Sequence, residues 1–521
     1  MKKLVCILLA LMLLCGCGAP AEETQVATES TGNGLQQVQI QGEEVVFEPW
    51  EQEGVPTEGC YYLTQDVVLT EPMVVAGQLK LHLNGHTVTG AEGVTFGNFV
   101  TVPAGGELVI YDDAQNTGAL VSPRSITAKQ QVVHMFQVEG TVTIAGGKMD
   151  ASQILLEDVA DGAGFYVSNG GVLNVCDGTI IGGTVWCSSL TPKQPEKLTE
   201  ETVPAGEVTE ETVVEEEPLP VRGMGGSIYV AAGGLCNISG GVIQDGCAGL
   251  GGNLYVQEDA ENPGRVVMSG GTILNGEAMF HAGNVYMAGV MEVSGGEIVQ
   301  GRAYGNGGNL LVSGTLEMTG GIVREGRCDA GGKSGKRGGN ILINGIDAVV
   351  HIANAQILDG NGQGSENFGG NICVMGQCAK EFTVTNTTIS GGHGHRGGNV
   401  YIGTLAKDVN PEILNYHMSN VTISGGFCSY RGGNLCMDSD LRGTYINLTM
   451  DNCIINQDGG SQESISLGAG AAIDTWATVT MNGGEINGGV VNLYLDAVLT
   501  ANGTKLPAEG HGGPGELVIV E

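Results

Sequence analysis

The chain has 521 residues, of which 89 are Gly, and its 57 acidic and 22 basic residues give a formal net charge of −35. Glycine makes up roughly 17% of the chain against a usual ~7%, while aromatic residues reach only 5% and charged residues 15%. This composition excludes an ordinary helical enzyme, and so acidic a chain will not bind nucleic acid by neutralising phosphates.

Residues 1–17 predict a lipoprotein signal peptide. Two lysines precede an apolar run that closes on "LCGC" at 14–17. A short basic head and about ten apolar residues form a secretory signal that is too short to span a bilayer. The last four residues resemble the lipobox of bacterial lipoproteins, although Cys15 stands where that family usually has a small residue or Thr. The resemblance implies that Cys17 is lipidated and anchors an exported protein at the extracellular face of the membrane; a plain secretory peptide is the alternative.

Two segments are predicted to stay outside the folded part. Residues 18–42 predict a flexible tether that holds the folded region away from the membrane. The segment at 191–220 contains five Pro and nine Glu, so it cannot bury enough apolar surface to fold. Residues 186–223 are therefore expected to form an acidic, disordered insertion.

A repeated Gly-Gly-Asn motif is the main structural signal in the central part of the chain. Its Asn recurs at spacings of 31, 25, 31, 31, 28 and 35 residues. The first and third residues after each Asn are apolar, and this period of two predicts a short strand with two inward positions. The repeated residues are Asn253, Asn284, Asn309, Asn340, Asn371, Asn399 and Asn434, with Ser227 in an earlier copy.

A second element recurs between these strands, for example as "ISGGVIQDG" and "VTNTTISGG". Its third position is always Gly or Asn, which accept positive φ most readily, and this predicts a left-handed corner between two short strands. The corner positions are Gly240, Gly270, Gly295, Gly320, Asn354, Asn386, Asn420 and Gly483.

Each repeat thus holds about three short strands and no helical pattern. A single repeat cannot bury its own apolar face, but repeats stacked about 4.8 Å apart can. The crossover rule favours a right-handed turn. Residues 43–495 therefore predict an all-β, right-handed parallel β-helix solenoid, followed by a C-terminal cap at 496–521. Stacked Asn side chains at a buried corner are expected to form a ladder of amide hydrogen bonds.

From about residue 60 to 495 the pattern resembles the right-handed parallel β-helix proteins of the pectate-lyase-like superfold. A stretch ending in "LNGHTVTG" also resembles the first coils of bacterial surface β-helix proteins. Such folds include lyases, hydrolases, adhesins and inert stalks, so the resemblance alone does not assign an activity.

Two rows of side chains are candidates for ligand binding. The middle residue of each Asn strand is expected to point outward, and Tyr occupies it four times, where sugar rings could stack; stabilisation of the sheet by stacked aromatics is the alternative. Basic residues gather in loops before Gly-Gly-Asn, where an anionic glycan could lie; local compensation of the acidic field is the alternative. The candidates are Tyr229, Tyr255, Tyr286, Tyr401, Lys333, Lys336, Arg337, His395, Arg396 and Arg431.

The candidates for catalysis are two carboxylates and a histidine. Glu325 and Asp359 occupy corresponding positions on successive coils, where a retaining glycosidase pair at about 5 Å could form. His393 lies in "GHGH", which is similar to the Gly-His-Gly motif of polygalacturonases, but the other motifs of that family are absent at matching positions. The Asp cluster that binds Ca²⁺ in pectate lyases is absent as well. No cofactor is predicted, because "DGNGQG" begins like a calcium loop but has Gly370 in place of its final Glu.

Two functions follow from these patterns. The first is a lipid-anchored cell-surface protein that is adhesin-like or binds a glycan without catalysis, with the membrane and a polysaccharide as partners. The second is a polysaccharide lyase or glycoside hydrolase that acts on a uronate-type polysaccharide. A structural spacer without ligand is a third reading. The missing catalytic motifs favour the first.

Overall fold

The computed structural model describes residues 29–521 apart from segments within that range. The segments outside this description are 32–34, 41–42, 52–53, 93, 95, 113–116, 124, 129–133, 158–161, 187–222, 330–335, 363–366, 376–378, 404–413, 439–445, 458–470, 476–477, 495–496 and 509–510. The predictions for the signal peptide with Cys17, for nearly all of the insertion at 186–223 and for Lys333 lie outside the described residues. Within the described residues, no helix is long and apolar enough to cross a membrane.

Four short strands form each central coil, and every one of them pairs in parallel with its equivalent on the next coil. Ile243 lies opposite Ile273 in this register, and Leu254 lies opposite Val285. One complete coil consists of β20 (Leu235–Ile238), β21 (Val242–Gln244), β22 (Cys247–Leu250) and β23 (Leu254–Val256). The sequence predicted about three strands per coil, and the additional one is the strand represented here by β22.

The strands belong to three sheets with 31, 10 and 15 members. The first sheet contains two rows, which β14 and β17 join because each continues through both. Its first row contains β4 (Gly59–Tyr62), β7 (Gln78–His82), β10 (Glu107–Tyr111), β14 (Thr141–Asp150), β17 (Val172–Ile181), β20, β24 (Arg265–Met268), β28 (Val290–Val293), β32 (Thr315–Met318), β36 (Val349–Ala353), β40 (Glu381–Thr385), β44 (Leu414–Ser419), β48 (Ile446–Asp451), β51 (Thr478–Asn482), β54 (Val498–Asn502) and β56 (Glu516–Val520). Its second row adds β5 (Val67–Leu69), β8 (Thr87–Gly90), β11 (Ala119–Val121), β21, β25 (Thr272–Leu274), β29 (Glu297–Val299), β33 (Ile322–Arg324), β37 (Gln356–Leu358), β41 (Thr388–Ser390), β45 (Thr422–Ser424), β49 (Ile454–Asn456) and β52 (Glu485–Asn487).

The other two sheets carry the candidate ligand-binding residues. The 10-stranded sheet contains β12 (Ser125–Ala128), β15 (Ile154–Glu157), β18 (Thr184–Trp186), β22, β26 (Glu277–His281), β30 (Arg302–Ala303), β34 (Arg327–Cys328), β38 (Asn361–Gly362), β42 (His393–Arg396) and β46 (Phe427–Arg431). The 15-stranded sheet contains β6 (Met73–Val74), β9 (Val100–Val102), β13 (Phe136–Val138), β16 (Phe165–Val167), β19 (Ile228–Val230), β23, β27 (Val285–Met287), β31 (Leu310–Val312), β35 (Ile341–Ile343), β39 (Ile372–Val374), β43 (Val400–Gly403), β47 (Leu435–Asp438), β50 (Ala471–Thr475), β53 (Val490–Leu493) and β55 (His511–Gly512).

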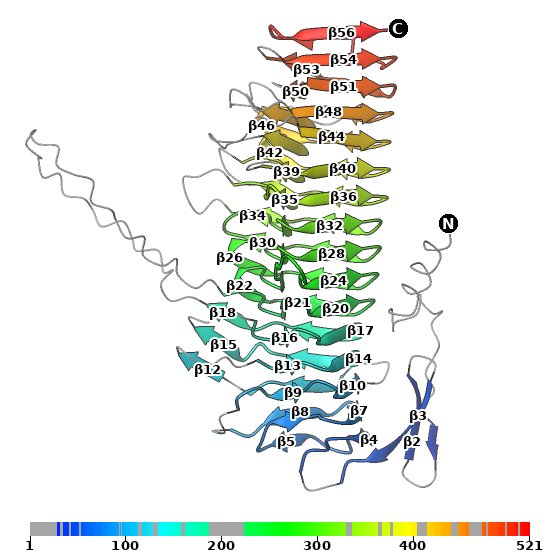
Figure 1. The fold of residues 1–521 in the computed structure, drawn as a ribbon, viewed down its shortest axis with the longest axis vertical. Helices are drawn as coiled ribbons and strands as arrows, with labels where there is room; N and C mark the ends of the chain where they lie inside the picture. The colour runs from blue at the N-terminus through cyan, green and yellow to red at the C-terminus, as the bar shows by residue number, and fades with distance from the viewer. Residues whose placement is uncertain are drawn as a thin grey trace, which may run out of the picture.

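The chain is a right-handed parallel β-helix. Figure 1 shows the coils stacked in one column, from the blue N-terminal coils at the bottom to the red C-terminal strands at the top. The column continues beyond residue 495, because β54 pairs in register with β51 and β56 pairs with β54. The predicted C-terminal cap at 496–521 thus includes strands that continue the parallel register, and its role as a cap stays a prediction. The inward alternation persists there, with Leu499 and Ala501 both buried.

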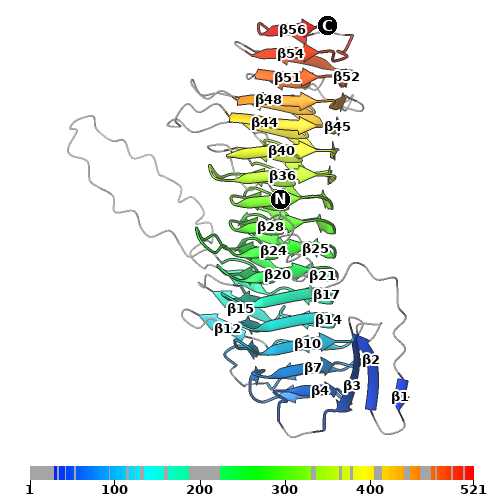
Figure 2. The same cartoon turned by 45° about the vertical axis from the view of Figure 1, so that its right-hand side comes forward.

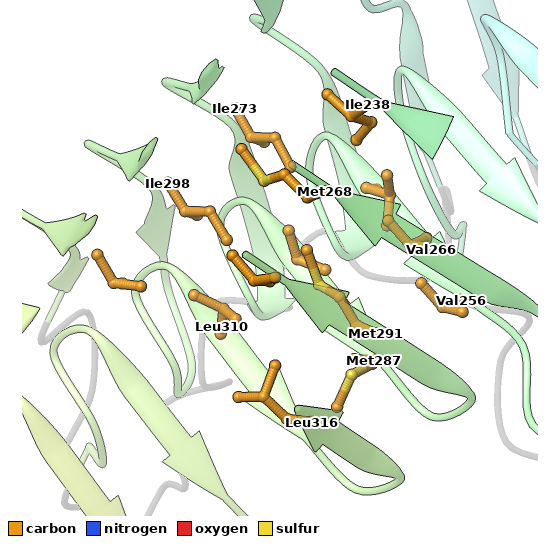
Figure 3. Packing of buried hydrophobic residues seen from close by; sticks show 14 of the residues in the cluster. Ile238, Val256, Val266, Met268, Ile273, Met287, Met291, Ile298, Leu310 and Leu316 are labelled. Atoms are coloured by element: carbon orange, nitrogen blue, oxygen red, sulfur yellow. The ribbon is translucent and has the colours of Figure 1, made fainter. Parts of the chain in front are cut away.

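The hydrophobic core fills the space inside the coils. Figure 3 shows side chains from successive coils that point into this common interior, with Ile273 and Ile298 in equivalent places. Among the described residues, one cluster of buried apolar side chains runs from Trp50 to Leu499, so the core continues along the solenoid. The labelled residues are Ile238, Val256, Val266, Met268, Ile273, Met287, Met291, Ile298, Leu310 and Leu316, all of them buried.

An antiparallel ribbon lies beside the first coils and supplies the remaining three strands of the first sheet (Figure 2). It consists of β1 (Glu29–Thr31), β2 (Leu35–Ile40) and β3 (Glu43–Pro49). The prediction of a flexible tether at 18–42 is wrong for β1 and β2. Val38 of β2 and Phe47 of β3 are buried in an apolar cluster that includes Tyr111 on the outside of β10, and this packing stabilises the sheet.

The Asn column forms at the corner that precedes the 15-stranded sheet. The Nδ2 of Asn340 donates to Asn371 Oδ1 at 2.8 Å, and Asn309 donates to Asn340 in the same way. Asn340 Oδ1 also accepts the backbone N–H of Gly326 at 2.7 Å, and its Nδ2 donates to the Leu358 carbonyl at 2.6 Å. All seven Asn side chains are fully buried. The predicted amide ladder is confirmed.

The left-handed corners differ from the prediction by one residue in part of the chain. Asn354 has a φ of 52°, as expected. At Gly483 the φ is 66°, also as expected, and the next Gly is left-handed too. In the four earlier Gly-Gly copies, however, only the second Gly takes positive φ, with 69° at Gly241 rather than at Gly240. A Cβ on Gly240 would collide with the Cys176 carbonyl on the preceding coil. The two glycines are thus required for different reasons, one for close approach and one for backbone conformation.

Candidate functional site

The residue before each Gly-Gly forms a column of its own along the outside of the solenoid. Arg337 pairs with Phe368, Phe368 with Arg396, and Arg396 with Arg431, each as a parallel bridge between successive coils. The following Gly is left-handed, with φ of 68° at Gly338, and this turns the chain into the next strand. Repetition of the same corner therefore places these side chains above one another.

The basic residues lie in regular structure as well as in loops. His395 and Arg396 belong to β42, and Arg431 belongs to β46, whereas the sequence predicted loops for all of them. Lys336 lies just before the Arg337 bridge, and its backbone N–H donates to Asn367 Oδ1 at 2.7 Å. The structure therefore brings together every basic candidate that it describes.

Aromatic rings lie between these cations. The guanidinium of Arg396 lies 5.6 Å from the ring centre of Phe368 and 5.3 Å from that of Tyr430. The guanidinium of Arg431 lies 4.7 Å from Tyr430 and 4.4 Å from Tyr494. Cations at these distances are attracted by the ring faces.

We call this group the cation–aromatic column. The imidazole of His395 completes it by stacking on Tyr430 at 5.1 Å. All of its side chains are partly exposed. Sequence reasoning missed the aromatic members, because they do not recur at one position of the repeat. The column consists of Arg337, Phe368, His395, Arg396, Tyr430, Arg431 and Tyr494.

The tyrosine row stacks as expected but is not an exposed surface. Tyr166, Tyr229, Tyr255 and Tyr286 stack with ring centres 5.2 Å apart at each step. Tyr166 extends the stack beyond the predicted residues. Tyr255 and Tyr286 are partly exposed.

The expectation of exposure is wrong for Tyr229, which is 4% exposed, and for Tyr401, which is 3% exposed. The glycine corners lie close over the row: a Cβ on Gly162 would lie 2.9 Å from the Cβ of Tyr229, and one on Gly397 would lie 2.9 Å from the Cβ of Tyr401. The row therefore acts mainly as sheet packing.

The predicted catalytic carboxylates lie at a strained corner of successive coils. Glu325 has a φ of 57° and Asp359 a φ of 52°, and the Glu325 N–H donates to the carbonyl of Leu358 at 3.1 Å. The carboxylate of Glu325 forms an ion pair with Arg324 and accepts a hydrogen bond from Gln300 at 2.8 Å. These contacts stabilise the corner, and the catalytic role of the pair stays a prediction.

His393 lies on the coil that follows Asp359. It is exposed at the start of β42, opposite Asn361 in the register, and its backbone N–H donates to the Gly360 carbonyl at 2.8 Å. Its ring centre lies 5.4 Å from that of Phe427. These contacts of His393 are with the sheet, and its catalytic role also stays a prediction.

A charged cluster links β26, β30 and β34. Asp329, which is buried, forms ion pairs with both Arg302 and Arg327, and Arg302 also pairs with Glu277 at 3.4 Å. The hydrogen bond to Asp329 raises the pKa of Arg302, and a hydrogen bond to Glu277 raises the pKa of Tyr304. Since each charge has an opposite partner, the cluster fixes the coils to one another.

Among the described residues, no group of three His, Cys, Asp or Glu side chains is placed to hold a metal ion. No protein-family model, curated protein or solved structure matches the chain significantly.

His351 is a titratable contact on the outer face of the first sheet. Its Nδ1 lies 2.7 Å from Glu317 and its Nε2 lies 3.0 Å from Glu381, on the two neighbouring coils. Partial burial alone would lower its pKa, but the hydrogen bonds to Glu381 and Glu317 outweigh burial and raise the pKa above its ordinary value. The imidazolium thus bridges three coils.

We expect His351→Gln to destabilise the protein at pH 5.5 by less than about 1 kcal/mol, because the side chain is one-third exposed and solvent screens the pair. A group whose pKa is raised on folding stabilises the folded state fully at pH values below its unfolded-state pKa, here about 6.5. This contribution is lost as the pH rises through the pKa of the folded state. The difference from wild type should therefore shrink at pH 8.5. Urea unfolding at both pH values measures it, with Thr383→Ala on the next coil as control; an equal loss at both pH values would contradict the bridge.

Proposed function

We propose that this protein is an exported, lipid-anchored surface β-helix that binds an anionic polysaccharide along the cation–aromatic column, without cleaving it. Cys17 carries the lipid in this proposal, and the solenoid presents the column away from the membrane. The observation that carries it is the packing of the Arg396 and Arg431 guanidinium groups against the rings of Phe368, Tyr430 and Tyr494 on a strongly acidic chain.

The chemistry of the column suits such a ligand. Guanidinium groups bind carboxylates or sulfates in a planar, two-point geometry, while ring faces stack on the apolar faces of sugars. Successive coils are about 4.8 Å apart, so the column offers a contact at regular intervals to an extended chain. A local acidic field would repel an anionic polymer elsewhere on the surface.

The contacts of the carboxylate candidates favour binding over catalysis. Glu325 is held by Arg324 and Gln300. The buried Tyr229 and Tyr401 make the tyrosine row a weaker candidate than the column.

The double substitution Arg396→Gln and Arg431→Gln should weaken retention of polygalacturonate by at least about tenfold. Each lost charge-assisted hydrogen bond is worth about 1.5–3 kcal/mol, and about 1.4 kcal/mol is tenfold in affinity. Affinity electrophoresis at 50 mM and 300 mM salt measures retention, and release of unsaturated or reducing ends measures cleavage.

Arg265→Gln is the matched control, because it removes a guanidinium that pairs with Glu292 at 2.6 Å on another sheet. It should leave retention unchanged. Equal losses of retention in the double variant and the control would contradict binding along the column. Cleavage of polygalacturonate by the wild type that Glu325→Gln abolishes would support the enzyme hypothesis in place of binding.

A further inference from the structure

Asn-Gly and Asp-Gly pairs recur along this chain, and such pairs are chemically labile. The backbone nitrogen of Gly can attack the side-chain carbon Cγ of the residue before it, because Gly has no Cβ to obstruct the approach. With Asn, the new C–N bond closes a succinimide ring, and the side-chain nitrogen leaves as ammonia with the proton of the Gly N–H. With Asp, the leaving group is water. A water molecule then opens the ring at either carbonyl, and the product is aspartate or isoaspartate.

The buried Asn column holds the attacking nitrogen at the corners of the coils. Gly276 follows Asn275, and its N–H donates to Asn284 Oδ1 at 2.9 Å. The acceptor is fully buried, so this nitrogen cannot attack until the corner opens locally. The Asn275 side chain is held as well, because its Nδ2 donates to Asp245 Oδ1 at 2.7 Å. Two Asp-Gly corners are bonded in the same way: Gly246, after Asp245, to Asn253 Oδ1 at 2.8 Å, and Gly360, after Asp359, to Asn371 Oδ1 at 2.8 Å.

Asn-Gly pairs away from the column are restrained by other contacts. In most of them the Gly N–H donates to an acceptor on a neighbouring coil: Gly85 to Asp112 Oδ1 at 2.9 Å, Gly170 to the Gly233 carbonyl at 3.0 Å, Gly307 to the Arg337 carbonyl at 2.8 Å, Gly483 to the Asn502 carbonyl at 2.7 Å and Gly503 to the Val520 carbonyl at 2.9 Å. Asn361 and Gly362 lie within the paired strand β38, and the Asn487 side chain bonds to both Asn456 and Lys505.

The pair Asn344–Gly345 lacks these restraints. It follows β35 in the turn that leads to β36, and Asn344 is exposed. Neither the Asn344 side chain nor the Gly345 N–H forms a hydrogen bond to another described residue. The Gly345 carbonyl accepts the N–H of Ala348 at 3.1 Å, which leaves the nitrogen side of Gly345 unheld. Ile346 is 54% exposed, so water reaches this turn.

We propose that Asn344 is a site of spontaneous deamidation, whereas the buried Asn column protects the labile pairs at the corners of the coils. The reaction at Asn344 places a negative charge near the exposed Asp347, and its isoaspartate product adds a methylene group to the main chain of the turn. The amide column then has a chemical role in addition to its role in packing. The inference does not depend on a polysaccharide ligand.

The first test follows both asparagines in the same molecule. The full chain is kept in a non-ionic detergent at neutral pH and 37 °C for several weeks, beside a portion unfolded in guanidinium chloride, and peptide mapping by mass spectrometry measures aspartate and isoaspartate. In the folded protein Asn344 should react at least about tenfold faster than Asn275, since about 1.4 kcal/mol of opening free energy accounts for a tenfold difference in rate. In the unfolded portion the two rates should be similar. Equal rates in the folded protein, or an unchanged Asn344 while the unfolded portion reacts, would overturn the proposal.

The second test removes one acceptor of the column. Asn284→Ala leaves Asn275 in place but frees the Gly276 N–H, so Asn275 should react at least about tenfold faster than in the wild type, while the rate at Asn344 should not change. Asn447→Ala is the matched control, because it removes an amide from an exposed face and should leave Asn275 protected. A variant Asn284→Ala that is folded by circular dichroism and keeps Asn275 as stable as in the wild type would contradict protection by the column.

A third measurement decides the question if Asn284→Ala does not fold. Amide hydrogen exchange of the wild type, corrected for the effect of sequence on the intrinsic rate, should be at least about tenfold slower at Gly276 than at Gly345, because only the first N–H is held in a buried corner. Equal exchange at the two glycines would overturn the proposal.

Discussion

Asn340→Ala is expected to lower the free energy of unfolding by about 4 kcal/mol. The substitution removes four hydrogen bonds at one corner, each of which contributes about 0.5–1.5 kcal/mol. It also leaves the buried Gly326 N–H without its partner, whereas the Leu358 carbonyl keeps the Glu325 N–H and the Asn309 and Asn371 amides keep one partner each. A buried group without its partner costs about 1–3 kcal/mol, and water has no access to this fully buried corner. The loss therefore exceeds that of an ordinary polar substitution.

Urea unfolding followed by circular dichroism measures the effect, and amide hydrogen exchange at Gly326 reports it locally. Asn447→Ala is the control, because its side chain also donates to an Asn on an adjacent coil, here the preceding one, but on the exposed face. The control should cost less than about 1 kcal/mol. Equal costs for the two variants would show that the buried column contributes no more than a surface pair.

Gly339→Ala is expected to destabilise by about 3 kcal/mol for a steric reason. Its φ is not in the left-handed region, so alanine is not strained by backbone conformation. A Cβ would, however, overlap the Gly370 carbonyl and the Asn361 backbone nitrogen of the next coil. Both obstacles are backbone atoms of a paired coil, so they cannot turn aside as a side chain would, and overpacking at such a site costs at least about 1–3 kcal/mol.

Gly97→Ala supplies the comparison, because no atom lies within 4 Å of its Cβ position and its φ is also outside the left-handed region. Thermal unfolding of both variants separates the effect of steric overlap from that of glycine entropy. A Gly97→Ala variant that falls as far as Gly339→Ala would show that general glycine entropy, and not the close approach of coils, controls stability.

The sequence predicts the repeated parts of this fold well. The Gly-Gly-Asn motif identifies the buried amide column, and the apolar residue after each corner identifies a core position such as Ile243 or Ile273. These signals persist because each coil places the same residue type in the same environment. The sheet that contains β22 was missed, because its strands share no residue type: "CAGL", "EAMFH" and "HGHR" have no common pattern.

The candidate site was predicted only in part for a related reason. Its cations precede a recognisable motif, but Tyr430 and Tyr494 come from different sheets and meet only in three dimensions. The burial of Tyr229 depends on neighbouring glycine corners that lie over the row, and period-two alternation does not reveal such a cover.

The amide column also affects how such a molecule can change its length. Every internal Asn meets the same partners above and below, so duplication or loss of one whole coil leaves no mismatched junction in the interior. The outer column lacks this regularity, since Arg337, Phe368, Arg396 and Arg431 follow one another, and the same event would alter its order of charges and rings. Duplication of whole coils therefore preserves the packing of the interior but changes the order of side chains on the surface.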